Sequence, residues 1–159
     1  MVSLPLARIH DLNMTMNEDC QIPIFHINYN ISVPSYGSKS KNRRFLPISP
    51  FGLESNKSIK HRETPIFIEN GNLRVEKISI KIPDGYEYEG ERTFTNELSN
   101  EFGSIQTTVS AGEKSIEISM KKLTRSGLFK PESYIDLKKF HDAIRKQGRK
   151  KIVLKQIEN

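Results

Sequence analysis

Apolar and polar residues alternate along most of this chain with the two-residue period of half-buried β-strands. In the clearest run, residues 25–33, every odd-numbered residue is apolar and every even-numbered residue is polar. A shorter run with the same period covers 12–16, and a turn-like segment at 17–20 separates the two. We therefore expect 12–16 and 25–33 to pair as an antiparallel hairpin with one apolar face.

Further short runs with strand character follow at 45–48, 65–68, 78–82, 86–89, 105–109 and 116–120. Pro47 suits an edge strand, because proline has no backbone N–H to donate to a neighbour. Turn sequences separate several runs, among them Asn70-Gly71-Asn72 and Pro83-Asp84-Gly85. Strands at this spacing predict a sandwich or barrel rather than alternating strands and helices.

The period changes to that of a helix in 131–147, where one face is apolar. That face consists of Tyr134, Leu137, Phe140, His141 and Ile144. Pro131 suits the first helical position and Gly148 the position just after the helix. A short apolar strand, 152–154, follows. The predicted fold is mainly β: an antiparallel β-sandwich with a single C-terminal amphipathic helix, covering a sheet face or an open end, and a short final strand.

The chain has the length of one ordinary domain. We assign residues 1–10 to a linker remnant and residues 11–159 to one β-sandwich domain. Apolar content is only 35%, which indicates a modest core under a polar surface. The predicted core is Phe25, Ile27, Ile31, Val33, Ile78, Ile80, Ile118, Leu137, Phe140 and Ile144.

Positive charge is concentrated near the C-terminus. Residues 120–155 hold twelve Lys or Arg against three Asp or Glu, a net of +9, whereas the rest holds thirteen against sixteen, a net of −3. The candidate anion-binding patch is Arg145, Lys146, Arg149, Lys150 and Lys151. It is either a footprint for nucleic acid or an acidic polysaccharide, or a solvated basic helix end that the helix dipole favours. Nucleic-acid platforms usually add stacking aromatics, and the nearby aromatics belong to the helix's apolar face, which disfavours nucleic acid.

The sequence gives little support to catalysis by a thiol. Cys20 is the single cysteine, which excludes an internal disulfide and a multi-cysteine metal site. Glu18 and Asp19 precede it, and their negative charges disfavour the thiolate that a nucleophile needs. A cysteine hydrolase built on Cys20, with His61 or His141 and a carboxylate, is therefore a remote alternative.

Metal binding and glycoside chemistry are no better supported. The four histidines lie far apart in sequence, and no two have the spacing of helical metal ligands. Glu87, Glu89 and Glu91 follow one side of a strand, which is more typical of a solvated face than of a catalytic carboxylate pair. Carbohydrate binding through exposed tyrosines is an alternative that the lack of tryptophan weakens. We expect no enzymatic activity in this chain, and no cofactor or metal.

Targeting signals are not visible in the sequence. No apolar run approaches the roughly 18 residues of a membrane-spanning helix. Residues 1–8 lack the basic start and apolar core of a signal peptide. We therefore expect no membrane span.

Several segments occur in an order that resembles a known family. They are Ile24-Phe25-His26-Ile27-Asn28-Tyr29, Pro34-Ser35-Tyr36-Gly37, Arg44-Phe45-Leu46-Pro47-Ile48, Arg62-Glu63-Thr64-Pro65-Ile66, Ile82-Pro83-Asp84-Gly85-Tyr86, Phe102-Gly103 and Lys130-Pro131-Glu132-Ser133-Tyr134. From about residue 11 to its end, the chain resembles the C-terminal β domain of unknown function of bacterial transglutaminase-like proteins. In those proteins a β domain comes first, a papain-like transglutaminase core second and a domain of this kind last.

The resemblance implies that the chain is the C-terminal fragment of a larger exported protein, located in the periplasm or at the cell surface. It carries over no catalytic residue. We accordingly expect a non-catalytic accessory or interaction domain whose partner is the upstream transglutaminase-like core of the same chain. The alternative is a binding module for an anionic polymer, through residues 145–151.

Overall fold

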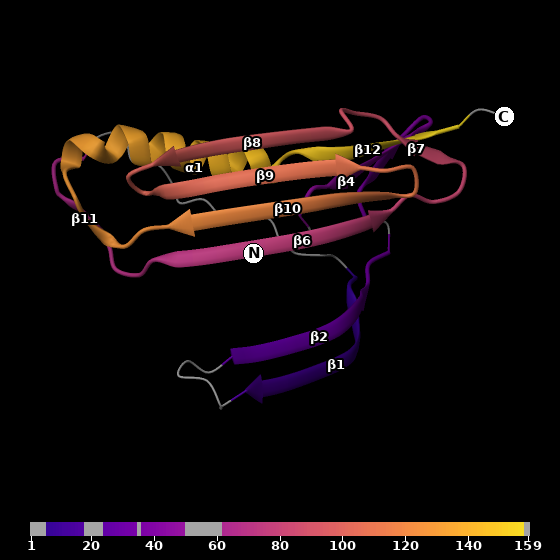
Figure 1. Cartoon of the computed structure of the whole chain (residues 1–159), viewed down its shortest axis with the longest axis horizontal. Coiled ribbons are helices and arrows are strands. Elements are labelled where there is room, and N and C mark those ends of the chain that lie inside the picture. Colours follow the sequence, from indigo (N-terminus) through magenta and orange to yellow (C-terminus); the bar gives the residue numbers. More distant parts are fainter. Residues whose placement is uncertain (1–5, 18–23, 35, 50–61, 158–159) are drawn as a thin grey trace. The chain divides into compact units, whose positions relative to one another are not determined.

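The computed structural model describes residues 6–17, 24–34, 36–49 and 62–157 (Figure 1). Tertiary contacts divide the chain into two units, one within residues 2–36 and the other over residues 37–159. The fold is mainly β, with antiparallel sheets, one C-terminal helix and a final strand, as the sequence predicted.

The first unit is the predicted hairpin, formed by β1 (Arg8–Asn17) and β2 (Ile24–Ser32). Its register breaks between His10 and Asn13, which is a β-bulge. The bulge shifts the alternation along β1, so that odd-numbered Ile9 and even-numbered Met14 lie on the same side. The hairpin therefore has one apolar and one polar face.

The second unit contains a four-stranded sheet, which we call the large sheet. Its strands are β6 (Asn72–Lys81), β8 (Thr93–Asn100), β9 (Gly103–Ala111) and β10 (Ser115–Thr124), in the order β6-β10-β9-β8. Along these strands, shielded and exposed side chains alternate almost without exception. One face of the large sheet therefore faces the interior and the other is largely polar and open to solvent.

A second four-stranded sheet, the small sheet, packs against part of the large one. Its strands are β3 (Ser38–Ser40), β4 (Arg43–Pro47), β7 (Tyr86–Tyr88) and β12 (Lys151–Gln156), in the order β3-β4-β12-β7. Strand β4 thus has a neighbour on each side and is not the edge strand that Pro47 suggested. Pro47 nevertheless lies beyond the end of β3, which pairs only with residues 43–45, so one side of the proline has no strand neighbour among the described residues.

The helix α1 (Tyr134–Gly148) covers the rest of the inner face, lying against β8 and β9 (Figure 1). A 3₁₀ turn, Pro131–Ser133, precedes it, so the α-helix begins three residues later than predicted. Gly148 is the last helical residue rather than the one after the helix, and Arg149 is the C-cap. Two short strands, β5 (Ile66–Ile68) and β11 (Gly127–Phe129), pair beside the helix.

The core consists of two clusters on the inner face of the large sheet. The sheet cluster, under the small sheet, is Ile48, Val109, Ile116, Ile118, Met120, Ile152 and Leu154. The helix cluster, under α1, is Ile66, Phe102, Ile105, Leu137, Phe140 and Ile144. The fold is thus a sandwich in which one helix replaces half of the second sheet.

The predicted core is correct in the second unit and wrong in the hairpin. Its members in β10 and α1 are buried, and those in β6 are half-buried against the sheet cluster. Ile27 and Ile31, however, are 54% and 39% exposed, and Val33 is half-buried. The side chain of Phe25 lies outside the described residues. Two paired strands form a single layer. Alternation along them predicts an apolar face, but it does not predict a second layer that would bury this face.

Candidate functional site

A row of inward-facing residues crosses the large sheet where its cover changes from α1 to the small sheet. Asn96 of β8 lies opposite Thr107 of β9, Thr107 opposite Met120 of β10, and Met120 opposite Glu76 of β6. Three of these four residues are polar, whereas the row on one side is wholly apolar and consists of Phe94, Val109, Ile118 and Ile78. We call the mainly polar row the seam. The last turn of α1 lies against it, because the Gln147 side chain contacts Thr107.

The centre of the seam is a satisfied polar contact. The buried Thr107 hydroxyl donates a hydrogen bond to the side-chain carbonyl of Gln147, in the last turn of α1. Buried polar groups are nearly always paired, and this pair attaches the helix end to the middle of the sheet.

At the β6 end of the seam, Glu76 is shielded from solvent, with 11% of its side chain exposed. The hydroxyl of Ser49 donates to Glu76 Oε2 at 2.8 Å, and the Arg74 guanidinium forms an ion pair with Oε1. Among the described residues, none donates a hydrogen bond of good geometry to Oε1, despite that contact. The charge of this carboxylate is therefore balanced mainly by Arg74.

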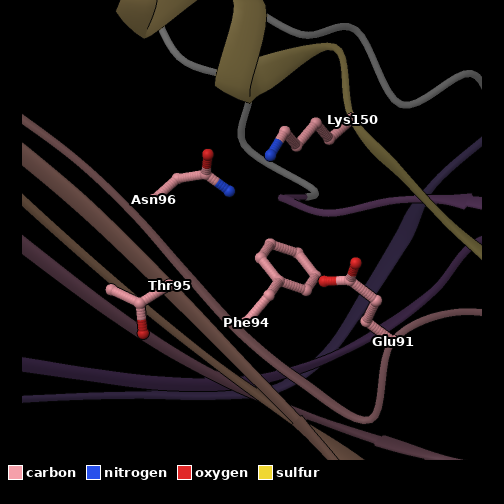
Figure 2. Close-up of a pocket in the computed structure, with 5 residues that line it drawn as sticks. All are labelled: Glu91, Phe94, Thr95, Asn96 and Lys150. Atoms are coloured by element: carbon pink, nitrogen blue, oxygen red, sulfur yellow. The ribbon is translucent and has the colours of Figure 1, made fainter.

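At the β8 end of the seam lies an open pocket of about 360 Å³. It is lined by Glu91, Phe94, Thr95, Asn96 and Lys150. Figure 2 shows the side chains of Asn96 and Lys150 pointing toward one another, and the Glu91 carboxylate beside the Phe94 ring. The Lys150 ammonium lies 4.9 Å from the centre of that ring, within the range of a cation–π contact. The pocket thus combines a cation, a carboxylate, an amide and an aromatic surface.

The five residues of the predicted anion-binding patch contact different parts of the fold. Arg145 forms an ion pair with Asp142 on the same helix. Lys150 lies over Phe94 of the large sheet, whereas Lys151 lies 5.9 Å from the ring of Phe45 in the small sheet. Lys146 and Arg149 are exposed. Polymer binding by the five together stays a prediction.

The other candidate site residues form separate contacts or lie outside the described residues. Arg43 binds Glu89 through Nε and a terminal nitrogen, at 2.5 and 2.7 Å, and this hydrogen bonding lowers the pKa of Glu89. Arg44 donates to the Tyr86 hydroxyl at 3.1 Å, which lowers the pKa of Tyr86. Cys20 and His61 lie outside the described residues. Among the residues that are described, no three His, Cys, Asp or Glu side chains form a group that could hold a metal ion.

Sequence reasoning missed Phe94 and Asn96, because it did not predict β8. The segment does alternate, with Phe94 and Leu98 pointing inward, but Asn96 stands between them at an inward position. A polar residue there breaks the apolar pattern by which strands are recognised.

Within the described helix, no stretch is long and apolar enough to cross a membrane.

His141, half-buried on α1, should make stability depend on pH. Burial lowers its pKa below the ordinary value near 6.5, Lys122 lowers it further, and Asp142 opposes the shift. The unfolded chain therefore takes up this proton at a higher pH than the folded chain does. Stability is fully present above pH 6.5 and should fall as the pH is lowered from there to the folded pKa. Urea midpoints measured between pH 8 and pH 5 should show a smaller loss for His141→Gln than for the wild type.

His26→Gln provides the control for this experiment, because His26 is exposed on β2. It should follow the wild-type profile. Parallel profiles for the wild type and His141→Gln would show that His141 does not contribute to the pH dependence.

Comparison with known proteins places most of the second unit in a family. Residues 42–154 match the family described as "Domain of Unknown Function with solved-structure structure (DUF3858)". The matched region contains the whole large sheet, the helix and the pocket, and it leaves out the β1–β2 hairpin. Searches of curated proteins and of solved structures give no match. Because the match covers more than half of its residues, the chain belongs to this family of domains of unknown function.

Proposed function

We propose that the chain is a non-catalytic accessory domain that docks on the transglutaminase-like core of its parent protein, in the periplasm or at the cell surface. The exposed apolar face of the β1–β2 hairpin carries this proposal. The link to a transglutaminase-like core rests on the family resemblance of the sequence, which carries over no catalytic residue.

The hairpin's apolar face is continuous across both strands. Ile9 lies opposite Ile31, and Met14 lies opposite Ile27. The exposed fractions run from 38% to 62% among the large apolar side chains of this face, Ile9, Met14, Met16, Ile27, Tyr29 and Ile31. An isolated two-stranded hairpin is at best marginally stable in water. Full burial of one such side chain contributes about 1.5–3 kcal/mol, so a covering surface would stabilise the hairpin substantially.

The size of this face favours a partner on the same polypeptide. Strands of about ten residues, spaced about 4.8 Å apart, present a face of roughly 300 Å². A stable complex between separate proteins usually buries about 800 Å² on each partner. A tethered partner needs less contact area, because linkage gives it a high effective concentration.

Hydrogen exchange tests the proposal in the intact parent protein. Amides of β1 and β2 should exchange more slowly in the parent than in this chain alone. Met14→Ser combined with Ile27→Ser should remove that protection, because it makes the apolar face polar. Thr15→Ala combined with Asn28→Ala, on the opposite face, should leave it intact. Equal exchange in the parent and in the isolated chain would contradict docking through the hairpin.

A further inference from the structure

Along one edge of the large sheet, strand β8 presents backbone groups that pair with no other described strand. The Ala111 N–H donates to the Arg92 carbonyl at 2.6 Å, which makes these two residues a hydrogen-bonded pair. In antiparallel pairing such pairs recur at every second residue, so the even-numbered residues of β8 bond to β9. The N–H and C=O groups of Thr93, Thr95, Glu97 and Ser99 therefore point away from β9. Among the described strands, β9 is the one neighbour of β8.

This edge lacks three of the devices that usually block edge-to-edge pairing. Proteins protect exposed edges with lysine, proline or β-bulges. Strand β8 contains neither Lys nor Pro, and its register with β9 runs from residue 93 to residue 100 without a break. The opposite edge strand, β6, does carry lysines on its outer face, Lys77 and Lys81. Of the two edges, β8 is the better template for an added strand.

The pocket at the end of the seam lies on this same edge. Thr95, whose backbone groups face outward, is one of its lining residues. A strand paired with β8 at Thr95 would therefore place a side chain near the Lys150 ammonium and the Asn96 amide, the two groups that face one another in Figure 2. Both can donate hydrogen bonds to a carboxylate.

We propose that the β8 edge is a docking site for an extended acidic peptide segment, which adds to the large sheet as a fifth strand and places a carboxylate beside Lys150. In strand addition, main-chain hydrogen bonds provide affinity and side-chain pockets provide specificity. The Lys150 ammonium, beside the Glu91 carboxylate in the pocket lining, attracts an acidic partner electrostatically. The site lies within the family-matched region and does not depend on the hairpin.

Selection from a phage-displayed library of random peptides, with the full chain as target, tests this site. The selected peptides should be rich in Asp and Glu and free of central proline. Their binding should shift the backbone amide resonances of Thr93, Thr95 and Glu97. Thr95→Pro should weaken binding at least about tenfold, because it deletes an outward-facing donor and obstructs the added strand while sparing the β8–β9 hydrogen bonds.

Two further variants make the result specific. Lys150→Gln should weaken binding roughly fivefold, as expected for a partly exposed ion pair. Ser79→Pro makes the equivalent change on the outer edge of β6 and should leave binding unchanged. If Thr95→Pro fails to fold, Lys150→Gln and the amide shifts decide the question.

Three outcomes would overturn the proposal. One is a selection that yields no binding peptide. Another is binding that resists both Thr95→Pro and Lys150→Gln. The third is heparin or DNA binding that Lys150→Gln abolishes and Thr95→Pro does not affect, which would identify a polyanion site in place of strand addition.

Discussion

Gly103→Ala should prevent the chain from folding stably, with a loss of more than about 4 kcal/mol in the free energy of unfolding. The φ angle of Gly103 is +149°, a conformation that L-residues rarely adopt. An added Cβ would lie 1.9 Å from the carbonyl oxygen of Leu123 and 3.1 Å from Phe140 Cζ. The first contact is with backbone of the neighbouring strand β10, so relief requires breaking the β9–β10 pairing. Urea unfolding followed by far-UV circular dichroism measures the loss.

Gly112→Ala is the matched control, in the turn between β9 and β10. Its nearest neighbour would be the Ser115 carbonyl oxygen at 3.5 Å, an ordinary contact distance. We expect a change below about 1 kcal/mol there, because the site has room for a methyl group. Equal stability of the two alanine variants would contradict the close contact between β9 and β10 at Gly103.

The strands that the sequence predicted are those whose inward positions hold apolar residues or threonine, which is enriched in strands. Ile105 and Val109 of β9, and Ile116 and Ile118 of β10, are buried, and of these four Ile118 was in the predicted core. Strand β8 was missed because asparagine, which is depleted in strands, stands at its inward position 96. Strands β3 and β11 were also missed, because β3 reads Ser-Lys-Ser, without an apolar residue, and β11 reads Gly-Leu-Phe, without alternation.

Alternation along a strand identifies its two faces but not the layer that covers the apolar one. Ile27 illustrates this limit, because it was correctly placed on the apolar side of β2 and wrongly assigned to the core. Turn sequences have a similar limit. Asn70-Gly71-Asn72 separates two strands, as predicted, but β5 pairs with β11 and β6 with β10, so no hairpin forms there.

The seam and its pocket could not be found from the sequence, because they depend on register. Glu76, Asn96, Thr107 and Met120 come from four strands, and they share one row only through the pairing of those strands. Lys150 was predicted as one of five basic residues in a sequence cluster. Its contact with Phe94 depends on where the helix ends over the sheet, and that position follows from packing rather than from local sequence.

Phe140→Ala should cost about 3–5 kcal/mol, as large-to-small substitutions of buried phenylalanine do. Phe140 is 1% exposed and lies in the middle of the helix cluster, between α1 and the large sheet. Its removal leaves a cavity there. The closely packed residues on both sides cannot move far enough to fill this cavity completely. Urea unfolding of both proteins measures the difference, and a loss below about 1 kcal/mol would contradict a docked helix.

Ile135→Ala separates packing from helix formation in this test. Ile135 belongs to the same helix, but it is 66% exposed and lies outside the helix cluster. Alanine has the higher helix propensity, so this variant should change stability by less than about 0.5 kcal/mol. A large loss for Phe140→Ala beside a negligible one for Ile135→Ala would assign the stability of the helix half to burial against the sheet. Equal losses would mean that α1 contributes through its own helicity, and that the sandwich does not need it as a covering layer.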